Sequence, residues 1–218
     1  MPSDTREDSR SSAATRGQRL FVAVLLPAAW VNTLTQAQEA LRGAGVRLRF
    51  VRAAQFHLTL RFFGDIPTSQ VKAIADAIAS VAQSSGPFTI SLGQPGAFGP
   101  AHRPRVIWIG IEDHTDSLAR LHRSLELALA RSGIAVTESE FNPHLTLARV
   151  PTPVSHDAGQ RISTALRALR LTPTPRATVD SLSLIESHLA REGAHYETIA
   201  AWPLSGAVQT DPPSDHAG

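Results

Sequence analysis

The sequence predicts an α+β protein, with two antiparallel or mixed sheets and helices packed on their outer faces. Short strand-like apolar runs alternate with single amphipathic helices, and many of these segments are joined by short turns. The second half of the chain repeats the order of elements found in the first. A chain of 218 residues, 42% of them apolar, is long enough for one compact domain or two small joined lobes.

The first half contains predicted strands and helices in alternation. Apolar runs and period-two alternation predict strands over 19–26, 46–51, 56–63 and 88–92. Apolar residues at helical spacing predict helices over 31–41 and 68–81, the second capped by Thr68. A loop rich in Gly and Pro over 93–104 ends this half.

The second half contains the same kinds of segment. Its predicted strands cover 105–111, 141–150, 177–185 and 194–200. Its predicted helices begin near the candidate caps Thr115 and Asp157. Residues 1–17 and 207–218 are predicted to be disordered tails because they are polar, which leaves 18–206 as a single folded domain.

Composition excludes several classes of protein. The chain has no cysteine, so disulfide scaffolds, zinc-thiolate sites, iron-sulfur clusters and cysteine nucleophiles are excluded. No apolar run approaches the roughly 18 residues of a membrane span, and the polar N-terminus is unlike a secretory signal. The net charge of +2 does not by itself indicate a nucleic-acid partner. We expect a soluble, cytoplasmic protein and take a monomer as its expected state.

One tetrapeptide occurs twice, as His57-Leu58-Thr59-Leu60 and as His144-Leu145-Thr146-Leu147. Both copies lie in predicted strands, 87 residues apart. On a strand, residues i and i+2 share a face and lie about 6.5 to 7 Å apart. Each histidine is therefore expected to lie beside its threonine, while the leucines face the core.

Two strands that each present an imidazole and a hydroxyl suit phosphoryl transfer. In-line attack needs a base on the entering water and an acid on the departing oxygen, on opposite sides of the phosphorus. Imidazole can do either near neutral pH, and threonine hydroxyls can donate hydrogen bonds to the non-bridging oxygens. We therefore predict His57 and His144 as catalytic residues and Thr59 and Thr146 as phosphate ligands. This chemistry requires no metal and no cofactor.

Two alternatives to this interpretation concern the histidines. Each tetrapeptide alone also fits a strand that holds a structural histidine beside a β-branched residue. The repetition favours a shared function over that interpretation. A zinc or iron site is a further alternative, although neither histidine has an obvious carboxylate at ligand spacing.

The paired motifs and their flanking segments resemble the 2H phosphoesterase superfamily, and within it the RNA 2′,3′-cyclic phosphodiesterases also described as 2′-5′ RNA ligases. The resemblance extends over nearly the whole predicted domain. The matching segments are 19–24, 57–64, 105–110, 143–149 and 186–196.

This resemblance implies two lobes related by a pseudo-twofold axis, each contributing one motif strand to a central cleft. It implies hydrolysis of a terminal 2′,3′-cyclic phosphate on RNA, with release of the 3′ oxygen and formation of a 2′-phosphomonoester. By the same resemblance His57 is the proton donor to the leaving oxygen and His144 is the proton acceptor that activates water. The motifs are identical, so the sequence alone does not separate these roles.

Three further residues are candidate substrate ligands. Arg149 matches a basic residue often found at this point of the family, but strict alternation from His144 places it on the opposite face unless a bulge intervenes. Arg105 suits a contact to a backbone phosphate and equally suits ordinary solvation. Phe21 suits stacking on a terminal base, and it also suits packing in the core.

Other residues near the motifs have weaker assignments. Alternation places Arg61 on the face of His57, at the edge of the expected cleft, where it suits guidance of RNA and equally suits ordinary solvation. Tyr196 and Glu186 are candidates to orient an active-site histidine. The remaining histidines, His122 among them, are expected at the surface or in local hydrogen bonds.

Three other functions stay open on the sequence alone. The same site can act on a small cyclic nucleotide or on an ADP-ribose cyclic phosphate. It can also run the reaction backward as a 2′-5′ RNA ligase, which mass action in water disfavours. The third function is a non-catalytic module that binds RNA ends.

Overall fold

Two antiparallel sheets form the centre of the computed structural model, which describes residues 17–135, 140–171, 176–190 and 193–207. The predicted α+β class is confirmed. The strands are β1 (Gly17–Leu25), β2 (Arg49–Phe50), β3 (His57–Pro67), β4 (Phe88–Phe98), β5 (Val106–Glu112), β6 (His144–Arg149), β7 (Ala177–Val179), β8 (Ser181–Ala190) and β9 (Gly193–Pro203). The helices are α1 (Ala28–Arg42), α2 (Thr68–Ser84), α3 (Ser117–Arg131) and α4 (His156–Ala168), with a 3₁₀ turn, η1, at Ala53–Gln55.

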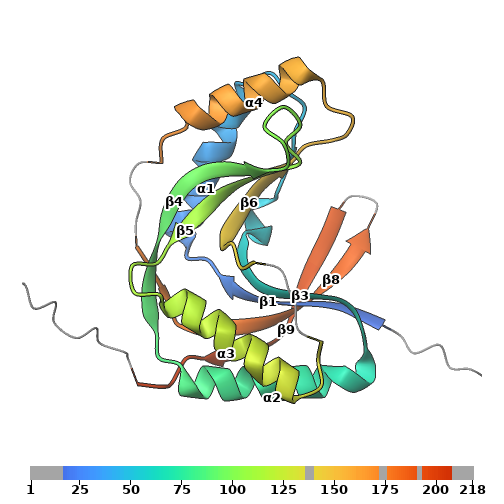
Figure 1. Ribbon diagram of the computed structural model, residues 1–218, viewed down its shortest axis with the longest axis vertical. Helices are drawn as coiled ribbons and strands as arrows, with labels where there is room; N and C mark the ends of the chain where they lie inside the picture. The colour runs from blue at the N-terminus through green and yellow to red at the C-terminus, as the bar shows by residue number, and fades with distance from the viewer. Residues whose placement is uncertain (1–16, 136–139, 172–175, 191–192, 208–218) are drawn as a thin grey trace, which may run out of the picture.

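The two sheets carry different pairs of helices. The four-stranded sheet has the order β3-β1-β8-β9, and α2 packs against β3, β8 and β9 with α3 beside it. The five-stranded sheet has the order β2-β6-β5-β4-β7, with α1 on β6 and α4 against β4. Figure 1 shows α1 and α4 together at one end of the molecule and α2 with α3 at the other.

Each half of the chain contributes strands to both sheets. From the first half, β1 and β3 belong to the four-stranded sheet, whereas β4 belongs to the five-stranded sheet. From the second half, β5 and β6 belong to the five-stranded sheet, whereas β8 and β9 belong to the four-stranded sheet. The order β3-β1-β8-β9 thus corresponds to β6-β5-β4-β7, with β2 added beside β6. The two motif strands occupy equivalent positions, in agreement with the expected pseudo-twofold arrangement.

The leucines of both motifs lie in one continuous core. Leu58 and Leu60 on β3, and Leu145 and Leu147 on β6, are buried in a single cluster that includes apolar residues of both sheets and all four helices. The prediction that the leucines face inward is confirmed. Their burial fixes the opposite face of each strand as the one that presents histidine and threonine.

Three strand predictions are wrong in their bounds. The strand β4 continues through 93–98, where a loop was expected, because a register shift between Leu92 and Pro95 accommodates the missing N–H of proline. The predicted strand 177–185 is two strands in different sheets, separated at Asp180. The predicted strand 46–51 contains only two residues in strand conformation, Arg49 and Phe50.

The predicted helix caps are also wrong: Thr68, Thr115 and Asp157. The helix α2 starts at Thr68 itself, after Pro67 in the N-cap position. At α3 the Asp113 carboxylate accepts the backbone N–H of Leu118 at 2.6 Å, and at α4 the Ser155 hydroxyl accepts that of Ala158 at 3.2 Å. In both cases an upstream oxygen satisfies the first-turn donor that the predicted cap was expected to satisfy.

The predicted tails 1–17 and 207–218 lie outside the described residues, except that Gly17 begins β1 and Ala207 follows β9. The expectation for Gly17 is therefore wrong, since it pairs with Pro67 on β3. Within the described ranges, no helix has both the length and the apolar character needed to span a membrane.

Candidate active site

The two motif strands approach each other across a hollow of about 360 Å³. Thr59, Arg61 and Phe62 of β3 line one side and His144 of β6 lines another, together with Asn142 and residues of α3. His57 and Thr146 lie beside this hollow and are not among its lining residues. His57 lies close enough to His144 for their charges to interact. The structure thus brings the two predicted catalytic histidines together at one site.

Both histidines are held by the same hydrogen bond. The Nδ1–H of His57 donates to the carbonyl oxygen of Gln55 at 2.8 Å, and the Nδ1–H of His144 donates to that of Asn142 at 2.8 Å. Because a carbonyl only accepts, each Nδ1 carries a proton and each Nε2 is the nitrogen available for proton transfer. The Gln55 side chain also donates to the carbonyl of Ala194 in β9, which ties the His57 anchor to the neighbouring hairpin.

His57 is enclosed by aromatic rings. Its ring centroid lies 4.7 Å from that of Phe21 and 5.3 Å from that of Tyr196, the latter in an edge-to-face contact at 90°. Burial lowers the pKa of His57 and the positive charge of His144 lowers it further, while the hydrogen bond to Gln55 opposes both effects. Phe21 is only 2% exposed, so its ring supports His57 and has no free face for a base.

His144 lies against a second aromatic pair. Its ring is 4.7 Å from Phe98, edge to face, and 6.2 Å from Trp108. The Trp108 ring covers Gly96 on β4, where an added Cβ would lie 2.3 Å from the ring. Only glycine at position 96 therefore leaves room for this arrangement. Phe98, which is 36% exposed, was not among the predicted site residues because residues 93–104 were expected to form a loop.

The two threonines share the face of their histidines. Thr59 and Thr146 are half-buried, and neither hydroxyl has a hydrogen-bond partner among the described residues. The burial of their strand neighbours leaves these hydroxyls pointing to the histidine side of each strand. Both hydroxyls are thus available to donate to a bound anion.

A β-bulge lies at the last residue of each motif and sets the face of the strand on which the next arginine lies. On β6, Trp108 faces Thr146 but Val106 faces Arg149, so Leu147 is the extra residue and Arg149 returns to the histidine face. A bulge is the condition under which Arg149 was expected to reach the cleft.

The bulge on β3 has the same geometry, but its arginine is the residue directly after the extra leucine, the position that Ala148 occupies on β6. Val22 faces Arg61 and Ala23 faces Thr59, so Leu60 is the extra residue and Arg61 turns to the core side. The placement of Arg61 at the cleft edge is wrong: it is 8% exposed and forms an ion pair with Glu126 of α3 at 2.9 Å.

Arg61 belongs to a largely buried polar network that lines the hollow from the core side of β3. Its guanidinium also donates to the carbonyl of Ala135, and the Glu126 carboxylate lies 3.8 Å from Nε2 of His122. His122 stacks on Phe141 at 3.9 Å between ring centroids, so it is packed, not a surface residue. Burial lowers the pKa of His122, with the Glu126 charge opposing and the Arg61 charge adding to this effect. The network connects β3 to the segment that precedes His144.

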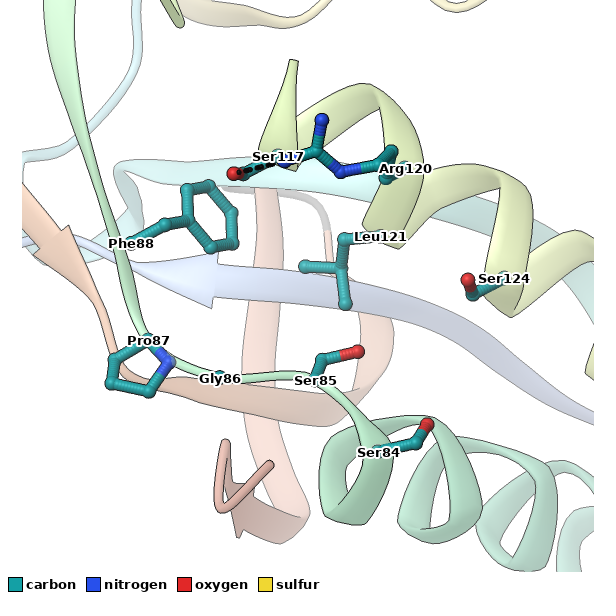
Figure 2. A pocket seen from close by; sticks show the side chains of 9 residues that line it. All are labelled: Ser84, Ser85, Gly86, Pro87, Phe88, Ser117, Arg120, Leu121 and Ser124. Carbon is teal, nitrogen blue, oxygen red and sulfur yellow. Dashed lines mark hydrogen bonds between the residues drawn. The ribbon is translucent and has the colours of Figure 1, made fainter. Parts of the chain in front are cut away.

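Arg105 lies elsewhere. It is exposed just before β5 and lines a separate hollow of about 440 Å³ with Pro100, His102 and Pro153, which includes no motif residue. A smaller hollow of about 110 Å³, between the end of α2 and α3, contains Arg120 hydrogen-bonded to Ser117 and again no motif residue (Figure 2). Among the described residues, no three His, Asp or Glu side chains gather as metal ligands would.

Comparison with protein families identifies the group to which this site belongs. The family profile described as the 2′-5′ RNA ligase superfamily matches residues 26–191. The chain belongs to this superfamily. The matched region includes both histidine motifs, the bulges that follow them and the helices that support them.

Curated relatives in this superfamily match along nearly their full length. A protein of Aeropyrum pernix named RNA 2′,3′-cyclic phosphodiesterase is 31% identical over 169 residues, which cover 78% of this chain and 93% of the relative. Proteins of the same name from Methanothermobacter thermautotrophicus and Escherichia coli are 28% and 29% identical, over 98% and 97% of their lengths.

Solved structures share the fold. The structure of TT0787 of Thermus thermophilus aligns with a TM-score of 0.70 at 26% identity, covering 86% of this chain and 98% of that one. Escherichia coli LigT complexed with 3′-AMP aligns with a TM-score of 0.65 at 26% identity, covering 87% and 99% of the two chains.

Proposed function

We propose that the protein hydrolyses RNA 2′,3′-cyclic phosphate ends to 2′-phosphomonoesters, with His57 as proton donor and His144 as proton acceptor. The observation that carries the proposal is the approach of two strands with identical motifs, whose histidines interact through their charges and each have Nδ1 anchored and Nε2 available. The names of the curated relatives support the same substrate class. One chain supplies both motifs, so we propose that a monomer is active.

The reaction needs two proton transfers and one displacement. Nε2 of His144 accepts a proton from water while the water oxygen forms a bond to phosphorus. The bond from phosphorus to the 3′ oxygen breaks on the opposite side, and Nε2 of His57 gives its proton to that oxygen. The pair ends with His57 neutral and His144 protonated, and exchange of one proton with solvent restores the starting state.

The substrate itself helps to set this protonation state. In the unliganded protein burial favours neutral His57, and a proton on His144 favours it further, so the two rings are disfavoured from being charged together. The cyclic phosphate carries one negative charge, and its arrival beside His57 favours the protonated imidazole. The threonine hydroxyls of Thr59 and Thr146 then donate to the non-bridging oxygens, where negative charge grows during attack. Phe21 and Tyr196 hold the His57 ring in place.

The proposal is tested by incubating the protein with RNA that ends in a 2′,3′-cyclic phosphate, with and without a chelator. We expect a 2′-phosphate product whose formation survives the chelator. His57→Ala and His144→Ala should each lower the rate by roughly a hundredfold or more, since general acid or base catalysis typically contributes that much. His114→Ala, which removes an exposed histidine outside the site, is the matched control.

Three outcomes would contradict the proposal. Product that ends in a 3′-phosphate would place the leaving group on the wrong oxygen. Full loss of activity with the chelator would indicate a metal-dependent reaction. Tight binding of the RNA without conversion between pH 5 and 9 would favour the non-catalytic binding module.

A further inference from the structure

Two arginines stand side by side on the histidine face of the five-stranded sheet. Arg49 of β2 is the register partner of Arg149 of β6, and Phe50 is the partner of Ala148. Ala148 and Phe50 pack on the core side, so the alternation of both strands directs Arg49 and Arg149 to the opposite side. That side is the one occupied by His144 and Thr146.

The pair has no counter-charge among the residues that the structure describes. Both arginines are exposed, and within the described ranges neither forms an ion pair or a side-chain hydrogen bond. Like charges directly opposite each other on neighbouring strands destabilise a sheet. A bound anion removes that repulsion, and two planar guanidinium groups suit a phosphate in particular.

The position of the pair along β6 identifies which phosphate it fits. Thr146 faces Trp108 and Arg149 faces Val106, so Arg149 is two register steps beyond Thr146. Two steps on a strand are about 6.5 to 7 Å, the same interval that separates His144 from Thr146. This interval is of the order of the spacing between successive phosphates of an extended RNA strand. When the cyclic phosphate lies beside Thr146, the next phosphate of an RNA strand that runs along β6 therefore lies beside the two arginines.

We propose that Arg49 and Arg149 form a subsite for the internucleotide phosphate next to the cyclic end. This inference rests on the proposed function for the identity of the terminal group, and it makes the substrate an RNA chain in preference to a mononucleotide. A mononucleotide cyclic phosphate lacks the second phosphate and leaves the subsite empty. Arg49 is thus a specificity-determining residue, contributed by a short edge strand outside both motifs.

The experiment compares two substrates that differ only in the charge of one linkage. Hydrolysis is measured for a diadenosine dinucleotide ending in a 2′,3′-cyclic phosphate, and for the same dinucleotide with a neutral methylphosphonate linkage. We expect kcat/KM to be roughly tenfold higher for the charged dinucleotide, the effect of about one charge-assisted hydrogen-bonded contact. Arg49→Ala should lower this ratio at least about threefold. Arg131→Ala, which removes an exposed arginine at the end of α3, should keep the ratio.

Equilibrium binding separates failure of this inference from failure of the proposed function. The Kd values of the corresponding 2′-phosphate dinucleotides should show the same preference for the charged linkage and the same loss in Arg49→Ala. Binding preference without hydrolysis would contradict the proposed reaction but support the subsite. Equal kcat/KM and equal Kd for the charged and neutral linkages, or a ratio unchanged by Arg49→Ala, would overturn the subsite.

Discussion

His57 and His144 share a motif and an anchoring hydrogen bond but differ in their surroundings. His57 is packed against Phe21 and Tyr196, whereas His144 has as its nearest ring the partly exposed Phe98. A pair of identical side chains can divide the roles of acid and base only if their environments differ. The structure supplies that difference at the level of single residues.

The protonation of His57 gives a prediction at this scale. An NMR titration of the imidazole C–H signals should place the pKa of His57 below its ordinary value of 6.5, because burial disfavours the charged ring. His144→Gln should move the pKa of His57 upward, since the substitution removes a neighbouring positive charge. His114→Gln serves as the control and should leave it unchanged. A His57 pKa above 6.5, or one that does not respond to His144→Gln, would contradict the electrostatic coupling.

At the scale of the element, the sequence predicts the face of each side chain correctly as far as the β-bulge in each motif strand, and not beyond it. Alternation correctly predicts that histidine and threonine share one face and that the leucines share the other. It fails one residue later, at Arg61, because a bulge depends on how the neighbouring strand pairs and not on the side-chain pattern. A bulge of the same kind at Leu147 directs Arg149 to the histidine face of β6.

The buried ion pair produced by the β3 bulge gives a prediction of stability. Glu126→Ala removes the partner of Arg61 and leaves a charged guanidinium buried under the sheet, which we expect to cost about 3 to 5 kcal/mol. Urea unfolding monitored by circular dichroism measures this change in the free energy of unfolding. The side chains of Arg61 and Glu126 are only 9% and 12% exposed, so the ion pair is screened far less than a surface pair.

The matched control for this measurement is an exposed ion pair. Asp76→Ala breaks the contact between Lys72 and Asp76 on α2, at 2.6 Å but largely in solvent, and should cost less than about 0.5 kcal/mol. If Glu126→Ala destabilises the protein no more than Asp76→Ala does, Arg61 is not held by the network described above.

At the scale of the whole molecule, the exchange of strands between the two halves creates the site. The repeated motif predicts that two strands meet, and the periodicity predicts most of the helices. Which sheet each strand joins is set by packing between distant parts of the chain, and no local pattern records it. The chain breaks at Asp180, so β7 and β8 belong to different sheets. The sequence pattern over 177–185 nevertheless predicts one continuous strand. The contact of Phe98 with His144 could not be predicted from the sequence either, because it depends on β4 joining the five-stranded sheet that contains β6.

The central claim is that His57 and His144 act on opposite sides of one phosphorus, one on the leaving oxygen and one on the water. The most direct measurement replaces the leaving 3′ oxygen of the cyclic phosphate by sulfur, because a thiolate departs without a proton. We expect the activity lost in His57→Ala to be largely restored with the sulfur substrate, while the activity lost in His144→Ala is not. Equal loss in both variants on both substrates, or restoration of His144→Ala alone, would contradict the account.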